Sequence, residues 1–212
     1  MGLKSYRLPM LRFYFRKKLV NSLKRNRLTT YVALIRGLNV GGKNKVPMDG
    51  LKKCVEKLGF SNVSTYIASG NIVIESDKEA DEVRDRIENA LPKSFELDDA
   101  LVKVLLLTQD QLKAVVKNKP KGFGEQPEKD HSDVIFLIGI DSGRVMPLFK
   151  PREGVDRVWP SDGVIYSQRL SSKRTKSRLN RIMATPEFKF MTIRNWSTTT
   201  KLLEIASNGT GR

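Results

Sequence analysis

The sequence predicts an α+β protein made of two packed subdomains, the first of which is a ferredoxin-like plait. Strand and helix patterns follow one another in the order β-α-β-β-α-β over residues 30–108, which is the element order of that plait. Further strand patterns begin after residue 132, and no Ser/Gly-rich linker separates the two halves. Apolar residues make up 39% of the 212-residue chain, which is enough for a substantial core.

The first subdomain is predicted to span residues 29–108. The run 31–35 is apolar throughout and predicts a buried strand, with a glycine-rich loop after it. We expect a helix to begin at Pro47, because proline suits the first turn of a helix, and to end at Gly59.

A hairpin, a second helix and a last strand complete this subdomain. Strands are predicted over 63–67 and 72–74, joined by a tight turn. The helix that follows is expected to be capped by Asp77 and to close before Pro92. The apolar run 102–107 predicts the last strand.

The second subdomain is predicted over residues 109–206, with a short tail at 207–212. It begins with a helix over 109–117 and continues in a polar loop up to residue 132 that we expect to be mobile. The remaining predicted elements are strands at 133–140, 155–159 and 164–168 and helices near 177–184 and 196–206. No sequence repeat is detectable between the halves.

The net charge of +16 is unevenly distributed along the chain. Residues 1–28 hold nine Lys or Arg and no acid, so the remaining 30 basic and 23 acidic residues leave only +7. Three interpretations of this basic leader stay open: an over-extended translation start, an organellar transit peptide, and a helix that lies on a membrane surface. More than half of the net positive charge therefore belongs to this leader and not to the predicted subdomains.

Several function classes are disfavoured by composition. The chain has one cysteine, Cys54, and one histidine, His131, so we predict no internal disulfide, no metal site and no cofactor. Cys54 lies in an apolar helical pattern and is expected to be a buried, inert thiol, whereas His131 is expected to be a solvated residue of the polar loop. No apolar run approaches the length of a membrane span, and we expect a cytoplasmic protein.

The best candidate site is the loop after the first strand. Backbone amides between a strand and a helix often collect an anion, and this loop combines glycines, asparagines and cations. The predicted ligand-binding residues here are Arg36, Asn39, Gly41, Gly42, Lys43 and Asn44. Glycines that serve only a tight turn are the competing interpretation, but a turn does not require the cations.

The same loop has the spacing of a Walker A motif. Gly37, Gly42 and Lys43 are in place, but Asn44 stands where a Ser or Thr would hold magnesium. The surrounding strands also predict an antiparallel plait rather than a parallel sheet. An ATPase or GTPase is therefore disfavoured.

Two further stretches supply candidate ligand-binding residues. The hairpin turn contributes Ser69, Gly70 and Asn71, and the stretch before the last helix contributes Arg194 and Asn195. We expect the hairpin turn and the glycine loop at opposite ends of neighbouring strands, so that a shared pocket would need a bend. Asn195 also suits a helix cap, and capping alone leaves Arg194 without an assigned partner.

A basic run with no acid between Gly163 and Pro186 is a candidate nucleic-acid surface. Cations at this spacing can neutralise several phosphates along a backbone, although a solvated basic face explains many such runs. The residues proposed for backbone contact are Lys173, Arg174, Lys176, Arg178 and Arg181.

Three stretches together resemble one family of mainly bacterial proteins catalogued as a domain of unknown function. They are ALIRGLNVGGKN at 33–44, TYIASGNIV at 65–73, and RNW at 194–196 with Thr198 and KLL at 201–203. The family pattern opens with ALLRGINVGGKN and closes with TRNWxT, so Leu38 and Ile193 are departures. The resemblance covers about residues 30–206 and implies two α+β subdomains with ferredoxin-like character. It implies no established activity and hence no catalytic residues.

Three functions remain in competition. The leading hypothesis is a protein that binds a phosphate-bearing ligand, either nucleic acid or a nucleotide, without metal-dependent catalysis. The second is an enzyme acting on a phosphorylated small molecule in a cleft between the subdomains, with a carboxylate as base. The third is a homodimeric interaction module with an apolar patch and no cleft.

Overall fold

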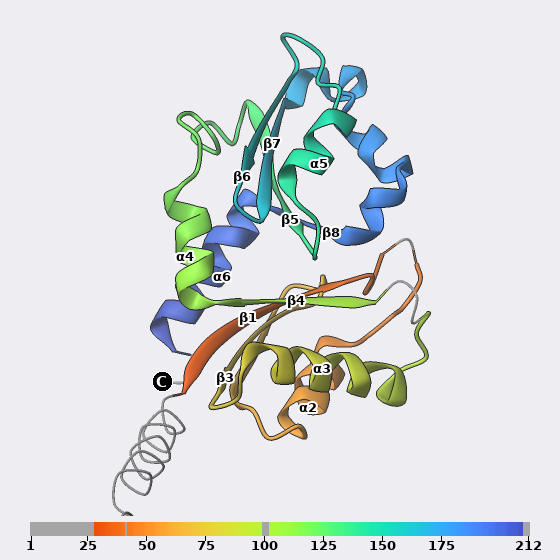
Figure 1. Cartoon of the computed structure of the whole chain (residues 1–212), viewed down its shortest axis with the longest axis vertical. Helices are drawn as coiled ribbons and strands as arrows, with labels where there is room; N and C mark the ends of the chain where they lie inside the picture. The colour runs from red at the N-terminus through yellow and green to blue at the C-terminus, as the bar shows by residue number, and fades with distance from the viewer. Residues whose placement is uncertain (1–27, 41, 99–101, 210–212) are drawn as a thin grey trace, which may run out of the picture.

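The computed structural model describes residues 28–40, 42–98 and 102–209. Helices and strands follow one another along the chain, and the strands form two four-stranded antiparallel sheets. The sheets stack one above the other (Figure 1). The predicted α+β class with two packed halves is therefore confirmed.

The first sheet has the strand order β2-β3-β1-β4, with every neighbouring pair antiparallel. This is the order of a ferredoxin-like plait. Its elements are β1 (Thr29–Arg36), α2 (Met48–Glu56), β2 (Ser61–Tyr66), β3 (Asn71–Ser76), α3 (Ala80–Ser94) and β4 (Lys103–Thr108). Helices α2 and α3 lie together on one face of the sheet (Figure 1).

Strand β1 is buried on both faces, as its uninterrupted apolar sequence predicts. Alternate side chains of a strand point to opposite faces. Ala33 and Ile35 pack with the apolar sides of α2 and α3, whereas Val32 and Leu34 belong to the core between the sheets.

The second sheet repeats the strand order of the first, as β6-β7-β5-β8. Its elements are β5 (Asp130–Leu137), α5 (Ser142–Val145), η2 (Met146–Leu148), β6 (Asp156–Ser161), β7 (Val164–Leu170) and β8 (Met191–Asn195). Three 3₁₀ segments, η3 (Ser171–Lys176), η4 (Leu179–Ala184) and η5 (Pro186–Phe190), replace the second helix of a plait. The halves thus share a topology although their sequences show no detectable repeat.

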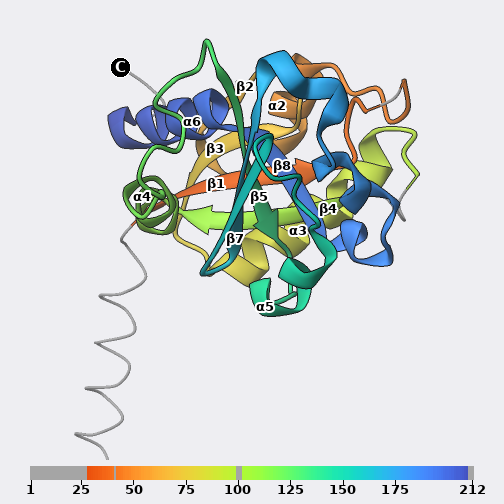
Figure 2. The ribbon, with the colours of Figure 1, turned by 90° about the horizontal axis from the view of Figure 1, so that it is seen from above.

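Two helices stand beside the space between the sheets, α4 (Gln109–Lys117) and α6 (Trp196–Asn208). Seen from above, they lie on the same side, and the strands of the second sheet cross those of the first (Figure 2). Leu112 of α4 and Leu202 of α6 pack with Val32, Phe136 and Tyr166 in one central core. This shared core buries apolar side chains from the inner faces of both sheets.

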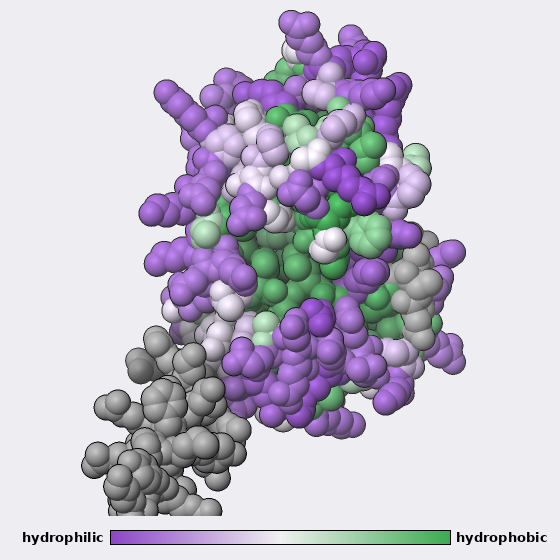
Figure 3. Space-filling model, in the orientation of Figure 1, coloured by the Kyte–Doolittle hydropathy of each residue, from purple (hydrophilic) through white to green (hydrophobic). Residues whose placement is uncertain are grey.

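The central core is open to solvent between α4 and β4, an edge strand of the first sheet. Apolar side chains gather there in a hollow between the halves (Figure 3), with a cavity of about 340 Å³. Three consecutive leucines of β4 line this hollow, namely Leu105, Leu106 and Leu107.

Two helix-end predictions in the first half are wrong. The residue that precedes α3 is Glu79 rather than Asp77, and it makes no side-chain cap. Pro92 lies inside α3, which ends at Ser94. A proline so near the end of a helix removes only one late hydrogen bond, so the helix continues for two more residues.

The second half differs from prediction in several elements, and the short helices α5, η2, η3 and η5 were not predicted. Strand β5 begins at Asp130, so His131 is a strand residue rather than part of the polar loop. The helix expected near 177–184 is a 3₁₀ segment, whose buried Leu179 and Ile182 have the three-residue spacing of that geometry. The five-residue strand β8 was not predicted, because it is too short to show a clear period.

The basic leader predicted for residues 1–28 lies outside the described residues except for Leu28. Among the residues that the structure describes, none of the helices has the length and apolar character needed to cross a membrane.

Candidate functional site

Arg194 of β8 connects the two halves of the molecule through its buried guanidinium. Nε donates to Asn71 Oδ1 (2.5 Å), and Nη2 donates to the carbonyl oxygens of Ile35 (3.0 Å) and Ser69 (2.8 Å). All three acceptors belong to the first half, at the end of β1 and around the hairpin turn.

The remaining N–H groups of Arg194 bind within β8. Nη1 donates to Thr192 Oγ1 and to the carbonyl oxygen of Ile193, each at 2.8 Å. With only 7% of the residue exposed, burial lowers the pKa of Arg194 to about 10, so the guanidinium is still protonated at neutral pH. Arg194 was proposed to bind a ligand, but its five donated hydrogen bonds give it a structural role.

The hairpin turn is organised by Asn71, which is fully buried. Its Nδ2 donates to the carbonyl oxygen of Tyr66 (3.0 Å) and to Ser69 Oγ (2.9 Å), while its Oδ1 accepts from Arg194. Gly70 has a φ of +69°, and a Cβ there would lie 2.9 Å from the carbonyl oxygen of Ile35. Asn71 and Gly70 therefore hold the backbone, and Ser69 alone of the three lines a cavity.

The expectation that the glycine loop and the hairpin turn lie at opposite ends of their strands is wrong. Leu34 pairs with Asn71, and the amide of Ile35 donates to the carbonyl oxygen of Gly70 over 2.8 Å. In an antiparallel pair the end of one strand meets the start of the other. The two motifs are neighbours without any bend.

Asn39 and Asn44 stabilise the glycine loop from within. Asn39 exchanges two hydrogen bonds with the backbone of Val46, through Nδ2 (3.0 Å) and Oδ1 (2.8 Å). Asn44 Nδ2 donates to the carbonyl oxygen of Gly37 (3.0 Å), and its Oδ1 accepts from the amide of Asp98 (2.8 Å). Both asparagines have positive φ, which asparagine tolerates well among residues with a side chain.

Two backbone amides of the loop are also occupied. The amide of Asn39 donates to the carbonyl oxygen of Asn44 (3.0 Å), and that of Lys43 to the carbonyl oxygen of Val40 (3.1 Å). Gly42 is exposed with a φ of +79°, and Gly41 lies outside the described residues. The structure therefore offers no cradle of free amides at Asn39 and Lys43.

Arg36, at the end of β1, reaches across to the second half. Its Nε donates to the carbonyl oxygen of Met191 (3.1 Å), and its guanidinium lies over the ring of Phe188 at 5.4 Å from the centroid. The side chain is half-buried, and burial lowers its pKa below that of a solvated guanidinium. A guanidinium remains charged under these conditions.

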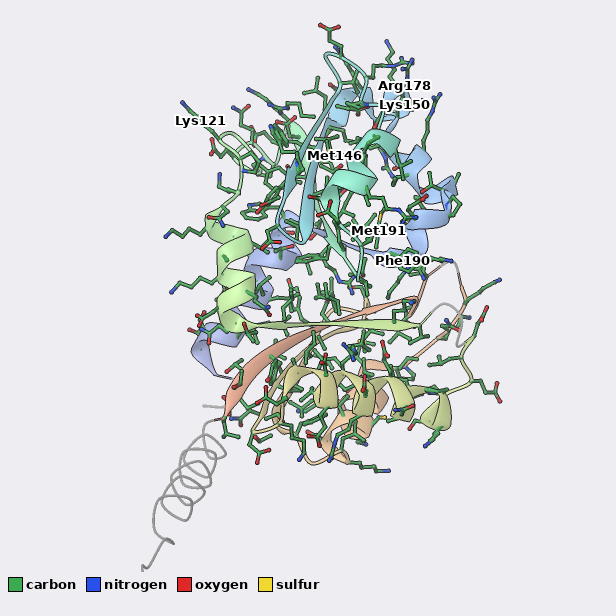
Figure 4. All side chains as sticks on the ribbon, in the orientation of Figure 1. Lys121, Met146, Lys150, Arg178, Phe190 and Met191 are labelled. Atoms are coloured by element: carbon green, nitrogen blue, oxygen red, sulfur yellow. The ribbon has the colours of Figure 1, made fainter. Side chains whose placement is uncertain are left out.

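These elements enclose a cavity of about 350 Å³, which we call the motif cavity. It brings together residues of all three sequence motifs and of the segment before β8. Its lining residues are Ile35, Arg36, Gly37, Leu38, Val40, Lys43, Ser69, Phe188, Met191, Thr192, Ile193 and Arg194. Met191 and the neighbouring Phe190 lie at the lower end of the second half, facing the first sheet (Figure 4).

The walls of the motif cavity are mostly apolar, and its charged groups are all cationic. Leu38, Phe188 and Met191 are among the apolar residues, and Arg36 and Lys43 bring positive charge in addition to the buried Arg194. Among the described residues that line it there is no Asp, Glu or His. The cavity is suited to an anion that carries an apolar body.

Sequence reasoning missed the wall that the second half contributes. Phe188, Met191 and Thr192 line the cavity although none was a candidate residue. The aromatic and apolar residues just before the third motif were the available signal. Without a predicted strand β8, nothing indicated that they face the glycine loop.

Asn195 is not part of the motif cavity. It is exposed, and its Oδ1 accepts from the amide of Thr198 (2.8 Å), which caps α6. The next residue, Trp196, packs edge-on against Phe123 with ring centroids 5.3 Å apart. The interpretation of Asn195 as a helix cap is confirmed.

The basic run lies apart from the motif cavity. Figure 4 shows Arg178 at the far end of the second half from the first sheet, whereas Met191 lies close to that sheet. Lys173, Arg174, Lys176 and Arg181 are exposed, but Arg178 is half-buried and its amide donates to Asp156 Oδ2 over 2.9 Å. The five proposed backbone contacts are therefore not one uniform exposed face.

The fold is shared with a solved protein of similar size. The chain is similar to a conserved bacterial protein, SP0830 from Streptococcus pneumoniae, with a TM-score of 0.72 and 24% sequence identity. The likeness covers 85% of this chain and 99% of that one, and it concerns the fold alone. No curated protein matches the chain.

One protein family matches by sequence. Its description is "Protein of unknown function (DUF1697)", and the matched stretch is residues 28–166, which includes the glycine loop and the hairpin turn. Because this stretch is more than half of the chain, the protein belongs to the DUF1697 family of unknown function.

Proposed function

We propose that the protein binds a small organic anion in the motif cavity, of the class of nucleotides and other organic phosphates. The observation that carries the proposal is the meeting of three distant motifs around one cavity with apolar walls and a cationic rim. Ligand sites are typically concave and mostly apolar, with a few polar groups that orient the ligand.

The charge of the lining selects the sign of the ligand. Lys43 is exposed at the mouth of the cavity, and Arg36 is held there by Phe188 and Met191. A cation fixed by its neighbours loses little side-chain freedom when it pairs with an anion. An anionic group would therefore bind at this rim, with the rest of the ligand against the apolar wall.

The shape of the site favours a small molecule over nucleic acid. A nucleic-acid backbone needs a continuous positive surface, and none of the cations of the basic run lines the motif cavity. A cleft between the halves was expected of an enzyme acting on a phosphorylated small molecule, and the motif cavity fits binding of such a molecule without catalysis as well. The same cavity weighs against an interaction module without a cleft.

The lining favours binding over acid–base catalysis. The enzyme hypothesis requires a carboxylate base, and the described residues of the motif cavity include neither a carboxylate nor an imidazole. The groups present can hold an anion and exclude water from its apolar part.

Thermal unfolding of the full chain with three probes tests the proposal. Phenyl phosphate carries both the anionic group and the apolar body of the proposed ligand. Inorganic phosphate carries the anionic group alone, and benzyl alcohol carries the apolar body alone. We expect saturable stabilisation by phenyl phosphate at least tenfold tighter than by either of the other probes.

Two lysines of the loop provide a matched pair of variants. Lys43 lines the cavity, whereas Lys45 is also exposed but does not line it. Lys43→Met should weaken phenyl phosphate binding about tenfold and Lys45→Met should not. Equal effects of the two substitutions, or no saturable shift with phenyl phosphate, would refute the proposal. Affinity for duplex DNA or RNA that exceeds the affinity for phenyl phosphate would favour nucleic acid.

A further inference from the structure

A further cavity of about 320 Å³ lies at the start of α6, apart from the motif cavity and from the hollow along β4. We call it the α6 cavity. Its lining includes Asp130, His131 and Ser132 of β5, and Trp196 and Thr200 of α6 together with the helix cap Asn195. It shares no lining residue with the motif cavity.

Two buried side chains of β5 bring unused hydrogen-bonding groups to this cavity. Asp130 and Ser132 are each only 8% exposed and line its wall. Within the described residues, Asp130 Oδ1 and Ser132 Oγ have no hydrogen-bond partner. A buried polar atom without a partner costs free energy, so native proteins usually satisfy it with protein, water or ligand.

The neighbouring strand adds a third such residue. Gln168 of β7 pairs with Ser132, is fully buried, and has no hydrogen-bond partner for either side-chain atom within the described residues. Seven buried side-chain atoms in the described part lack a partner, and four of them belong to Asp130, Ser132 and Gln168. This concentration at one place distinguishes the patch from scattered defects.

The charges around the α6 cavity favour a neutral ligand. The other oxygen of Asp130 accepts from Arg157 Nη2 over 2.8 Å, so the carboxylate is already paired. His131 Nε2 is 3.1 Å from Asp133 Oδ1, and Arg169 Nη1 is 3.6 Å from Asp133 Oδ2. The first turn of α6 carries partial positive charge, which disfavours a cation.

Hydroxyl groups match the atoms that lack partners. A hydroxyl of the ligand can donate to the carboxylate oxygen of Asp130 and accept from Ser132, whereas Gln168 does not line the cavity and can act only through its neighbour Ser132. Trp196 supplies an aromatic wall beside these groups, and Thr200 a further hydroxyl. An apolar ring with convergent polar groups suits the alternating C–H and O–H surface of a sugar.

From this combination we infer that the α6 cavity is a binding site for a neutral polyhydroxyl ligand, a sugar or the ribose of a nucleoside. Asp130 and Ser132 bind its hydroxyl groups and Trp196 packs on its carbon face. Gln168 supports the site from the adjacent strand.

Binding to the full chain is measured by calorimetry and by saturation-transfer NMR. The hydroxyl probes are D-ribose, D-glucose and uridine, and methylammonium chloride is the cationic probe. We expect saturable binding of at least one hydroxyl probe. If the ligand is the ribose of a nucleoside, uridine should bind more tightly than ribose. If the ligand is a free sugar, uridine and ribose should bind with equal affinity.

The decisive variant is Ser132→Ala, with Ser64→Ala as its matched control. Ser64 Oγ is another buried atom without a partner in the described residues, but Ser64 lies in β2, away from the cavity. Removing such a hydroxyl is near neutral for stability, so both variants should unfold within about 2 °C of the parent protein. Ser132→Ala should weaken binding at least tenfold, whereas Ser64→Ala should leave it unchanged.

A second, independent readout uses Trp196. In a Trp159→Phe variant Trp196 is the only tryptophan, and its fluorescence should change with the same saturation curve. Four outcomes would overturn the inference: no saturable signal with any hydroxyl probe, preference for methylammonium, equal binding in the two serine variants, or saturable binding without a response from Trp196.

Discussion

Arg194 Nε donates to Asn71 Oδ1 over 2.5 Å, and this hydrogen bond joins residues 123 positions apart in the sequence. The donor belongs to the second half of the molecule and the acceptor to the first. Arg194 and Asn71 together position β8 against the hairpin turn, and both the motif cavity and the cap of α6 depend on where β8 lies.

Replacing Arg194 should therefore destabilise the whole protein. Arg194→Met keeps much of the side-chain volume but removes all five donors, so Asn71 Oδ1 and the carbonyl oxygens of Ile35 and Ser69 lose their hydrogen bonds to the guanidinium. We expect a loss of about 3–5 kcal/mol in the free energy of unfolding, measured in urea.

Arg86→Met provides the control for that substitution. Arg86 is exposed and pairs with Glu82 on the surface of α3, so its replacement should cost less than about 1 kcal/mol. Equal losses in the two variants would contradict the role assigned to Arg194.

Asn44 should stabilise the fold both through its side-chain hydrogen bonds and through its tolerance of a positive φ. Asn44→Gly keeps access to the φ of +48° but loses the hydrogen bonds to Gly37 and Asp98. Asn44→Ala loses both, so it should cost about 1 kcal/mol more than Asn44→Gly. Chemical unfolding of both variants tests the order, and an alanine variant as stable as the glycine variant would show the loop to be unstrained.

Gly124 should not tolerate any side chain. A Cβ at this position would lie 2.3 Å from Trp196 Cδ1, and the φ of +69° adds strain. We expect Gly124→Ala to cost about 2–4 kcal/mol and to shift tryptophan emission. Gly122→Ala has a similar φ of +82° with nothing within 4 Å, so it should cost only about 1 kcal/mol. If both variants lose the same stability, Trp196 does not pack as described.

Asp156 should contribute to stability against acid. Burial would raise its pKa, but backbone donation from Arg178 and Arg152 outweighs burial and holds the pKa below the ordinary value of 3.8. Because the unfolded chain then binds the proton more readily, this stability is present above about pH 4 and is lost as the pH falls through the lower folded pKa.

Urea unfolding between pH 2 and 7 measures this effect. Asp156→Asn should be about 1–3 kcal/mol less stable at neutral pH and should show a smaller loss of stability below pH 4 than the parent protein. Parallel pH profiles for the two proteins would exclude Asp156 as the source.

Local patterns were sufficient to predict most of the fold. The apolar run of β1 and the helical spacing of Val83, Ile87 and Leu91 reflect direct burial, and these residues lie in the core. Thr108 and Gln111 form the capping box that starts α4 at its predicted residue. Such features depend on neighbours within one or two turns, which a single sequence displays.

The site depends on longer distances, and much of it could not be predicted. Nothing local shows that Arg194 would be buried among carbonyl groups and one amide of the other half. Nor does the loop sequence show that Asn39 binds the backbone of Val46 and Asn44 the amide of Asp98, so both asparagines were predicted to bind a ligand. The motif positions were identified, but their roles required tertiary contacts.

The placement of α6 has a consequence for the order in which the protein can be completed during synthesis. Val32, Leu34 and Val73, which lie in the first half of the chain, pack in the same core as Leu202 and Ala206 of the last helix. Nascent chains emerge from the ribosome N-terminal end first, so this apolar face is not fully covered until almost the whole polypeptide is made. The first half is thus the part of the molecule that most needs protection from aggregation while the ribosome is still at work.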